Sequence, residues 1–284
     1  MANTLRLKRR IKTAQNVSKT TRAMQMIAAS KLKRAQAAAL SSRPYVEKLT
    51  LLSNNLTAKI DKDSLHPYMK PGKSDKELLI IISPDKGLCG GLVTNLIKEY
   101  LTLKTKDLIL LTIGKKAQSY VLHTRQEIIA SFPFGTTLPS FDVVYPIIKI
   151  INDHFLEAGV GSVKILTSHF TSIFSQKPVI TTLLPITLPP ETEKSSNVLL
   201  FEPNIAEILP DLLKHYLEMT LYQYLLEGYL SEQAARMFAM QNATDNAKDM
   251  IEELTLEYNK ARQEKITSEI LDISSVSFFA YAQE

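Results

Sequence analysis

Two stretches at the ends of the chain, both poor in Gly and Pro, have helical periodicity. Residues 2–43 contain neither residue type and are dense in Ala, Lys, Arg, Gln and Met, which are good helix formers. Apolar or small residues recur there at three- and four-residue steps, which is typical of a face that packs on a partner helix. The face comprises Leu7, Ile11, Ala14, Thr21, Met24, Ala28, Leu32, Ala35 and Ala39, followed beyond Pro44 by Val46, Leu49 and Leu56. The pattern predicts one continuous helix, bent but not ended at Pro44.

The C-terminal third repeats this pattern. Residues 211–275 contain no Pro and a single Gly, Gly228, and Pro210 suits the first turn of such a helix. At about 1.5 Å per residue an unbroken helix here is roughly 95 Å long, which is more than its own chain can cover. We expect it to pair with the N-terminal helix and to be surrounded by other proteins or by solvent. The expected pairing positions are Ala234, Met237, Phe238, Ile251, Leu254, Tyr258, Ala261, Ile266, Ile270 and Ile273.

Between the two long helices the hydrophobic period changes to that of an α/β domain. Short apolar or β-branched runs predict strands at residues 78–83, 108–113, 162–170 and 178–186. Helical patterns separate them at residues 92–104, 115–124 and 143–158. Strands that alternate with helices predict a mostly parallel sheet, and the short polar connection before the last strand predicts an antiparallel hairpin at the sheet edge.

Composition fits a folded protein with strongly uneven charge. The 284 residues are 45% hydrophobic and 22% charged, which excludes a largely disordered chain, and the single cysteine excludes an internal disulfide. Residues 1–46 hold eleven Lys or Arg and no acid, whereas residues 202–284 hold six basic and fifteen acidic side chains. No run of about 20 apolar residues and no signal peptide is present, so a cytoplasmic protein is expected.

The loop Ser83–Gly91, after the first predicted strand, is the best candidate for chemistry, because glycines between a strand and a helix can hold phosphate on backbone N–H groups. It contains neither G-x-x-x-x-G-K-[ST] nor G-x-G-x-x-G, which favours a tight packing turn over a phosphate site. Cys89 lies in this loop and is better interpreted as a buried small residue than as a nucleophile. The histidines lack metal-ligand spacing: His66, His123, His154, His169 and His215. We therefore expect no catalytic residue, no cofactor and no metal in this chain.

The basic N-terminal helix leaves several functions open. Clustered Lys and Arg form the kind of footprint that neutralises nucleic-acid phosphates. The acidic C-terminal helix can neutralise part of this charge, and an acidic protein surface would explain the remainder equally well. A basic coiled-coil nucleic-acid binder and a nucleotide-using α/β enzyme with helical arms therefore stay open as alternatives to an assembly subunit.

Five blocks in order along the chain resemble the gamma subunit family of the F-type ATP synthases. Thr20–Leu32 is similar to T-[KR]-A-M-E-M-V-A-A-S-K-M, with Gln25 where Glu is usual, and Asp85–Leu92 is similar to D-R-G-L-C-G-G-L. The remaining blocks are S-E-Q-A-A-R-M at residues 231–237, A-T-D-N-A at residues 243–247, and Y-N-K-A-R-Q through I-T-x-E-[IL] at residues 258–270. Near the C-terminus Val276-Ser277 stands where the family commonly has Gly-Ala, and the paired-cysteine insert of chloroplast members is absent.

The resemblance implies a rotor rather than an enzyme. The implied fold is a long antiparallel coiled coil of the N- and C-terminal helices with an inserted Rossmann-like α/β domain. Its expected segments are residues 1–60, 75–195 and 204–284. The implied function is that of the central-stalk rotor subunit of a membrane-bound rotary ATP synthase. Such a subunit couples ion flow through the c-ring to conformational changes at the catalytic beta subunits and regulates ATPase activity.

The resemblance also implies partners, site residues and a location. The partners are the hexamer of alpha and beta subunits, the epsilon subunit and the c-ring, with no nucleic acid and with membrane attachment only through the complex. The location is the cytoplasmic face of the bacterial plasma (inner) membrane. By family position, contacts to beta subunits come from Arg22, Met24, Arg262, Gln263 and Thr267, the foot that faces the c-ring from Phe201 and Glu202, and the apolar bearing at the tip from Ile266, Ile270, Ile273, Phe278 and Phe279.

Overall fold

The computed structural model describes residues 2–57, 66–72, 74–103, 108–124, 126–157, 159–187 and 204–281. The chain divides into two compact units, one formed by residues 1–27 with residues 239–284 and the other by residues 28–238. Two long helices contribute to both units: α1 (Ala2–Thr57) and α5 (Ile205–Tyr281). Both helices that the periodicity predicted are therefore present, and α1 continues through Pro44. No helix in the described ranges is both long and apolar enough to cross a membrane.

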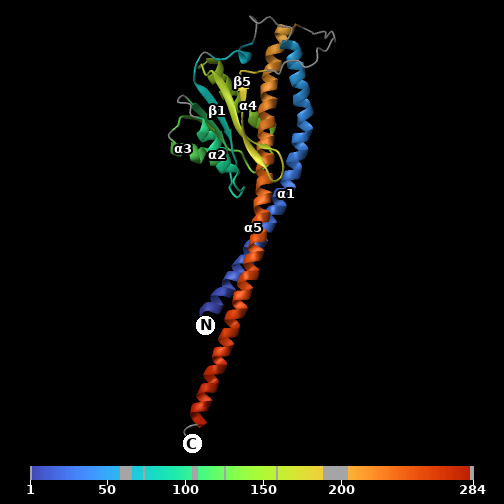
Figure 1. Ribbon diagram of the computed structural model, residues 1–284. Coiled ribbons are helices and arrows are strands. Elements are labelled where there is room, and N and C mark those ends of the chain that lie inside the picture. Colours follow the sequence, from blue (N-terminus) through green and yellow to red (C-terminus); the bar gives the residue numbers. More distant parts are fainter. Residues whose placement is uncertain are drawn as a thin grey trace. The chain divides into compact units, whose positions relative to one another are not determined.

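The larger unit contains a five-stranded sheet in the order β3-β2-β1-β4-β5 (Figure 1). All neighbouring strands are parallel except β4 and β5, which form an antiparallel hairpin at the sheet edge, as predicted. The strands are β1 (Glu77–Ile82), β2 (Leu108–Ile113), β3 (Ile128–Phe132), β4 (Ser162–Phe170) and β5 (Gln176–Leu184). The shorter helices are α2 (Leu92–Thr102), α3 (Lys115–Thr124) and α4 (Val144–Asn152).

The sheet is buried on both faces because alternate residues of its central strands pack in opposite directions. Leu78, Ile80 and Ile82 of β1 belong to the core shared with α4 and with the parts of α1 and α5 in this unit. Leu79 and Ile81 face the other way, into a second core closed by α2 and α3. This arrangement explains why β1 reads as an uninterrupted apolar run and not as an alternating one.

The structure corrects three details of the sequence-based assignment. Strand β3 was not predicted, because this edge strand is half-buried and its run of apolar residues is short. Pro210 does not lie in the first turn of α5, because the helix begins five residues earlier, at Ile205. The predicted helix 143–158 is α4 followed by a π-helical turn, Asp153–Glu157.

In the smaller unit, the N-terminal part of α1 packs against α5. The hydroxyls of Thr21 and Thr244 lie 2.7 Å apart in a buried hydrogen bond between the two helices. Leu7 and Ala14 of α1 and Leu254 of α5 are buried in this unit, as their period predicted. Ile266 and Ile270 do not follow that prediction: they expose 43% and 60% of their surface and are not pairing positions within this chain.

Candidate functional site

The loop after β1 is held by a single carboxylate. Asp85 Oδ1 accepts hydrogen bonds from the backbone N–H of Lys115 (2.9 Å) and of Phe134 (3.2 Å), and its Oδ2 accepts one from Gly135 (2.8 Å). The side chain thus joins the segments that follow β1, β2 and β3 at the carboxyl ends of these parallel strands. Sequence reasoning missed this role, although an acidic residue between a buried strand and a Gly-rich turn was a visible signal.

This arrangement argues against a phosphate site at the same edge. Lys115 is the first residue of α3, so the Asp85 carboxylate already occupies the anion-binding position at that helix N-terminus. Gly114 leaves no room either: a Cβ there would lie 1.9 Å from the carbonyl oxygen of Ser83. Gly114, which follows β2, therefore serves close packing. Within the loop Ser83–Gly91 a Cβ at Gly87 or Gly91 would meet no atom closer than 3.7 Å, and Gly90 supports the turn through its positive φ of 58°.

Two of the sequence blocks meet at this loop. The guanidinium of Arg236, in the S-E-Q-A-A-R-M block of α5, donates to the carbonyl oxygens of Lys86 (3.1 Å) and Gly87 (3.3 Å). Its other terminal nitrogen lies 2.6 Å from the carboxylate of Glu232, one helical turn earlier. Cys89 packs with Leu92 and Ala235 in a small buried cluster, although it lies almost 150 residues from the α5 block. The loop after β1 and the S-E-Q-A-A-R-M block of α5 therefore pack directly against each other.

The electrostatics of this contact indicate structure and not catalysis. Burial raises the pKa of the Glu232 carboxyl, and the charge of Arg236 opposes this shift. Burial likewise raises the pKa of the Cys89 thiol, and only 2% of Cys89 is exposed, so this thiol lacks the properties of a nucleophile. Within the described residues no cluster of His, Cys, Asp and Glu could hold a metal ion.

The residues that the family resemblance assigns to contacts with beta subunits lie on α1 and α5 in the smaller unit. Arg22 is exposed and Met24 half-buried on α1, and three residues of α5 are exposed: Arg262, Gln263 and Thr267. Ile266 and Ile270 are exposed on the same part of α5. The α5 backbone continues through Ile273, Phe278 and Phe279, whose side chains are outside the described part, and Phe201 and Glu202 lie outside the described residues altogether.

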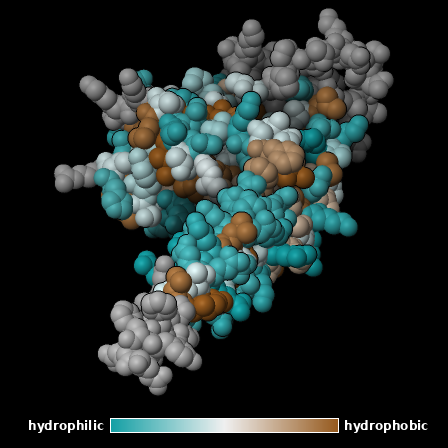
Figure 2. All heavy atoms as spheres, turned by 60° about the horizontal axis from the view of Figure 1, so that its bottom comes forward, coloured by the Kyte–Doolittle hydropathy of each residue, from teal (hydrophilic) through white to brown (hydrophobic). Residues whose placement is uncertain are grey.

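The basic side chains of α1 are mostly not neutralised by α5. In the described residues one ion pair joins the two helices, Arg43 with Glu227 at 3.9 Å, and it lies in the larger unit. The acidic residues of α5 that form other ion pairs do so with basic residues of α5 itself or with His169 of β4. In the smaller unit, Arg6 and Arg10 line a cavity with Glu257 and Glu264, and no ion pair in the described part of the chain bridges it. The helical surface that comes forward in Figure 2 is correspondingly mostly hydrophilic, with isolated hydrophobic patches.

Comparison with known proteins agrees with this architecture. Residues 3–277 match the model of the family described as ATP synthase. The ATP synthase gamma chain of Dehalococcoides mccartyi (strain CBDB1) is 41% identical over 278 residues, which cover 96% of this chain and 97% of the relative. That of Methylacidiphilum infernorum is 35% identical over 292 residues, with 98% and 99% covered.

Solved structures support the fold at lower identity. The central stalk and c-ring structure of the Tetrahymena thermophila mitochondrial ATP synthase has a matching chain with a TM-score of 0.60 and 24% identity, covering 79% of this chain and 99% of that one. A chain of the Euglena gracilis mitochondrial ATP synthase matches with a TM-score of 0.61 and 17% identity, covering 94% and 96%.

The fold, in which a sheet domain is inserted in the sequence between two long helices, together with the family match defines a non-catalytic stalk subunit. On the family match and the relatives, this chain belongs to the gamma chain family of the ATP synthases. The nucleic-acid-binding alternative has no support among these comparisons.

Proposed function

We propose that this chain is the rotating central-stalk subunit of a membrane-bound rotary ATP synthase. Ion flow through the c-ring turns the stalk, and the turning stalk favours a different nucleotide-site conformation at each beta subunit in succession. The chain also regulates the ATPase activity of the complex. The observation that supports this proposal most directly is the family membership over nearly the full chain, together with long helices whose charged and apolar side chains are left exposed.

The paired helix segments would act as an antiparallel coiled coil. Supporting contacts run in opposite directions along the two helices: Thr21 meets Thr244 in the smaller unit, and Ser42 donates to Gln223 in the larger one. Buried Ala14 and Ala247 leave little side-chain bulk on this face, which lets two helix backbones approach closely. In this proposal residues 1–60 and 204–284 form the shaft and residues 75–195 form the domain outside the hexamer.

The exposed cations of α1 support contact with an acidic protein surface. Among the described residues of the smaller unit they are exposed and form no ion pair with α5, so an acidic partner could bind them without first breaking internal pairs. We assign the torque-bearing contacts with beta subunits to Arg22, Met24, Arg262, Gln263 and Thr267. The alpha and beta subunits would form the hexamer around this surface.

Exposed apolar residues on α5 support a bearing role for its end. Ile266 and Ile270 present apolar surface to solvent in the isolated chain, which is unfavourable unless a partner covers it. An apolar sleeve would cover them without directional hydrogen bonds and would therefore oppose rotation little. We assign Ile273, Phe278 and Phe279 to the same bearing from their family positions.

The opposite end of the shaft would face the membrane sector. We assign the foot to Phe201 and Glu202, in contact with the c-ring, with the epsilon subunit beside it. Attachment to the membrane would be peripheral and only through the complex, on the cytoplasmic face of a bacterial plasma membrane.

The experiment is a double substitution of Arg262→Ala with Gln263→Ala in the assembled enzyme. Membrane vesicles that contain the variant complex should show lower ATP synthesis at an imposed ion gradient, because two polar contacts to the beta subunits are lost. Lys98→Ala with Gln126→Ala likewise removes one cationic and one amide side chain, here from exposed positions of the sheet-containing unit, and should leave synthesis unchanged. Equal synthesis in both variants would remove Arg262 and Gln263 from the torque path. Failure of the whole chain to assemble with alpha and beta subunits would refute the rotor assignment itself.

A further inference from the structure

A cavity of about 410 Å³ lies in the larger unit, between the two long helices and the hairpin at the sheet edge. Arg43, Val46 and Glu47 contribute to it from α1, and β4 and β5 contribute one wall with His169, Val179 and Thr181 among others. The opposite wall comes from α5 and includes Tyr216, Gln223, Tyr224 and Glu227. A cavity of this size falls within the range of small-molecule sites and is far larger than the space of a single water.

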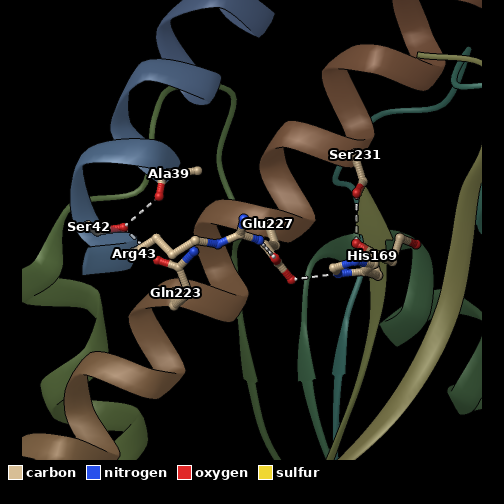
Figure 3. Close-up of polar contacts among 8 residues, drawn as sticks. Ala39, Ser42, Arg43, His169, Gln223, Glu227 and Ser231 are labelled. Carbon is tan, nitrogen blue, oxygen red and sulfur yellow. Dashed lines mark hydrogen bonds and ion pairs between the residues drawn. The ribbon is translucent and has the colours of Figure 1, made fainter. Parts of the chain in front are cut away.

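Glu227, one of the lining residues, lies between Arg43 and His169, as Figure 3 shows. Its Oε2 lies 3.1 Å from Nδ1 of His169, and its Oε1 lies 3.9 Å from the guanidinium of Arg43. Gln223 accepts a hydrogen bond from Ser42 through its side-chain oxygen, which leaves its amide N–H groups available to a ligand. Arg43 is 56% exposed, so most of its donors are also available.

Hydroxyl groups make up much of the remaining polar lining. Tyr216, Tyr224 and Thr181 bring three of them to the walls, beside the apolar surface of Val46 and Val179, and the hydroxyls of Tyr224 and Thr181 are hydrogen-bonded to each other. Two more belong to Thr167 and Thr220, whose Oγ1 atoms are buried and have no hydrogen-bond partner among the described residues. These oxygens are shielded in the present rotamers, and a turn about χ1 exchanges the oxygen of a threonine with its methyl group.

The charges of the lining select against strongly anionic ligands. The lining carries two carboxylates, those of Glu47 and Glu227, and one guanidinium, that of Arg43. With the imidazole of His169 neutral, a phosphate or a polycarboxylate would therefore meet more negative than positive charge. A neutral molecule with many hydroxyls can instead donate to and accept from the Thr, Tyr and Gln groups, while its C–H faces pack on the tyrosine rings and valines.

We propose that this cavity binds a neutral polyhydroxylated molecule of the size of a mono- or disaccharide. The ligand would contact α1, the β4–β5 hairpin and α5 at once, and its binding would strengthen the attachment of both long helices to the sheet. This proposal does not depend on the rotor role, because it rests only on groups within the larger unit.

The test measures the binding of D-glucose and of trehalose to the full chain by ligand-observed saturation-transfer NMR. Saturable binding of at least one sugar in the millimolar range is expected. Val179→Phe should weaken sugar binding at least tenfold, because the larger ring fills the cavity. Val179 lies on the edge strand β5 and is 38% exposed, so the strand can accept the larger side chain. Ile173→Phe is the matched control, since Ile173 has the same exposure at the tip of the same hairpin but does not line the cavity.

A conservative variant keeps the test independent of cavity filling. Tyr224→Phe removes one hydroxyl while keeping the ring, and it should weaken sugar binding several-fold without loss of the folded unit. Absence of saturable binding by both sugars overturns the proposal, as does binding that Val179→Phe and Tyr224→Phe leave unchanged. Citrate bound in preference to the sugars would also overturn it, because the charge argument excludes that ligand class.

Discussion

Replacing Asp85 tests whether one carboxylate holds together the carboxyl-terminal edge of the sheet. Asp85→Ala removes the acceptor of three backbone N–H groups at 2.8 to 3.2 Å. A hydrogen bond to a charged group is worth about 1.5–3 kcal/mol, but the side chain is only half-buried and water can replace part of each bond. At about 1 kcal/mol per bond, the free energy of unfolding should fall by about 3 kcal/mol.

Asp85→Asn should have an intermediate effect. An amide oxygen in the place of Oδ1 can still accept from Lys115 and Phe134, whereas the amide nitrogen in the place of Oδ2 faces the N–H of Gly135. The loss should therefore come mainly from the Gly135 segment. Hydrogen exchange measured by mass spectrometry should show faster amide exchange at the Gly135 segment in the Asp85→Asn variant. In the Asp85→Ala variant, exchange should be faster at all three segments.

Urea unfolding followed by tyrosine fluorescence measures the global effect. The chain has no Trp, and nine of its eleven Tyr lie between residues 28 and 238, so the signal reports mainly on the sheet-containing unit. Asp142→Ala, at an exposed position of the same unit, should change the free energy of unfolding by less than about 0.5 kcal/mol. If Asp85→Ala matched this control and left amide exchange unchanged, the carboxylate would not hold the three segments.

Two further predictions concern the same loop region. Gly114→Ala should lower the free energy of unfolding by at least about 3 kcal/mol, because φ is +105° and the new Cβ would lie 1.9 Å from the Ser83 carbonyl oxygen. Gly135→Ala is the control: φ is +82° but no atom lies within 4 Å, so the free energy of unfolding should fall by only about 1 kcal/mol. Equal losses in urea titrations would show that the close approach at Gly114 is not limiting. Cys89 should react with iodoacetamide at pH 8 at least about tenfold more slowly in the folded chain than in urea, since burial shields the thiol and raises its pKa, which lowers the thiolate fraction. Labelling of the folded chain should rise with pH, and equal rates with and without urea would contradict the buried position.

Local patterns determined a large part of the fold. The three- and four-residue period of α1 located Ala28, Leu32 and Ala35 on a buried face, and the apolar runs of β1 and β2 located two central strands. These features depend on side-chain periodicity and on intrinsic backbone preference, both of which are written in neighbouring residues. The half-buried edge strand β3 has too weak a pattern of either kind. Pro210 shows that a long helix can accommodate a proline five residues after its first residue.

Only the tertiary structure decided which distant residues meet. Asp85 binds backbone groups up to 50 residues away, and Arg236 binds carbonyl groups about 150 residues away, so neither contact has a periodic signature in the sequence. The exposure of Ile266 and Ile270 likewise follows from where a partner helix lies and not from their own apolar character. The sequence by itself determined the long helices, four of the five strands and the family blocks, because each is a local pattern. Packing between segments that are far apart in the chain decides the remaining features. These are the attachment of the loop after β1, the lack of ion pairs for most basic side chains of α1, and the cavity at the β4–β5 hairpin.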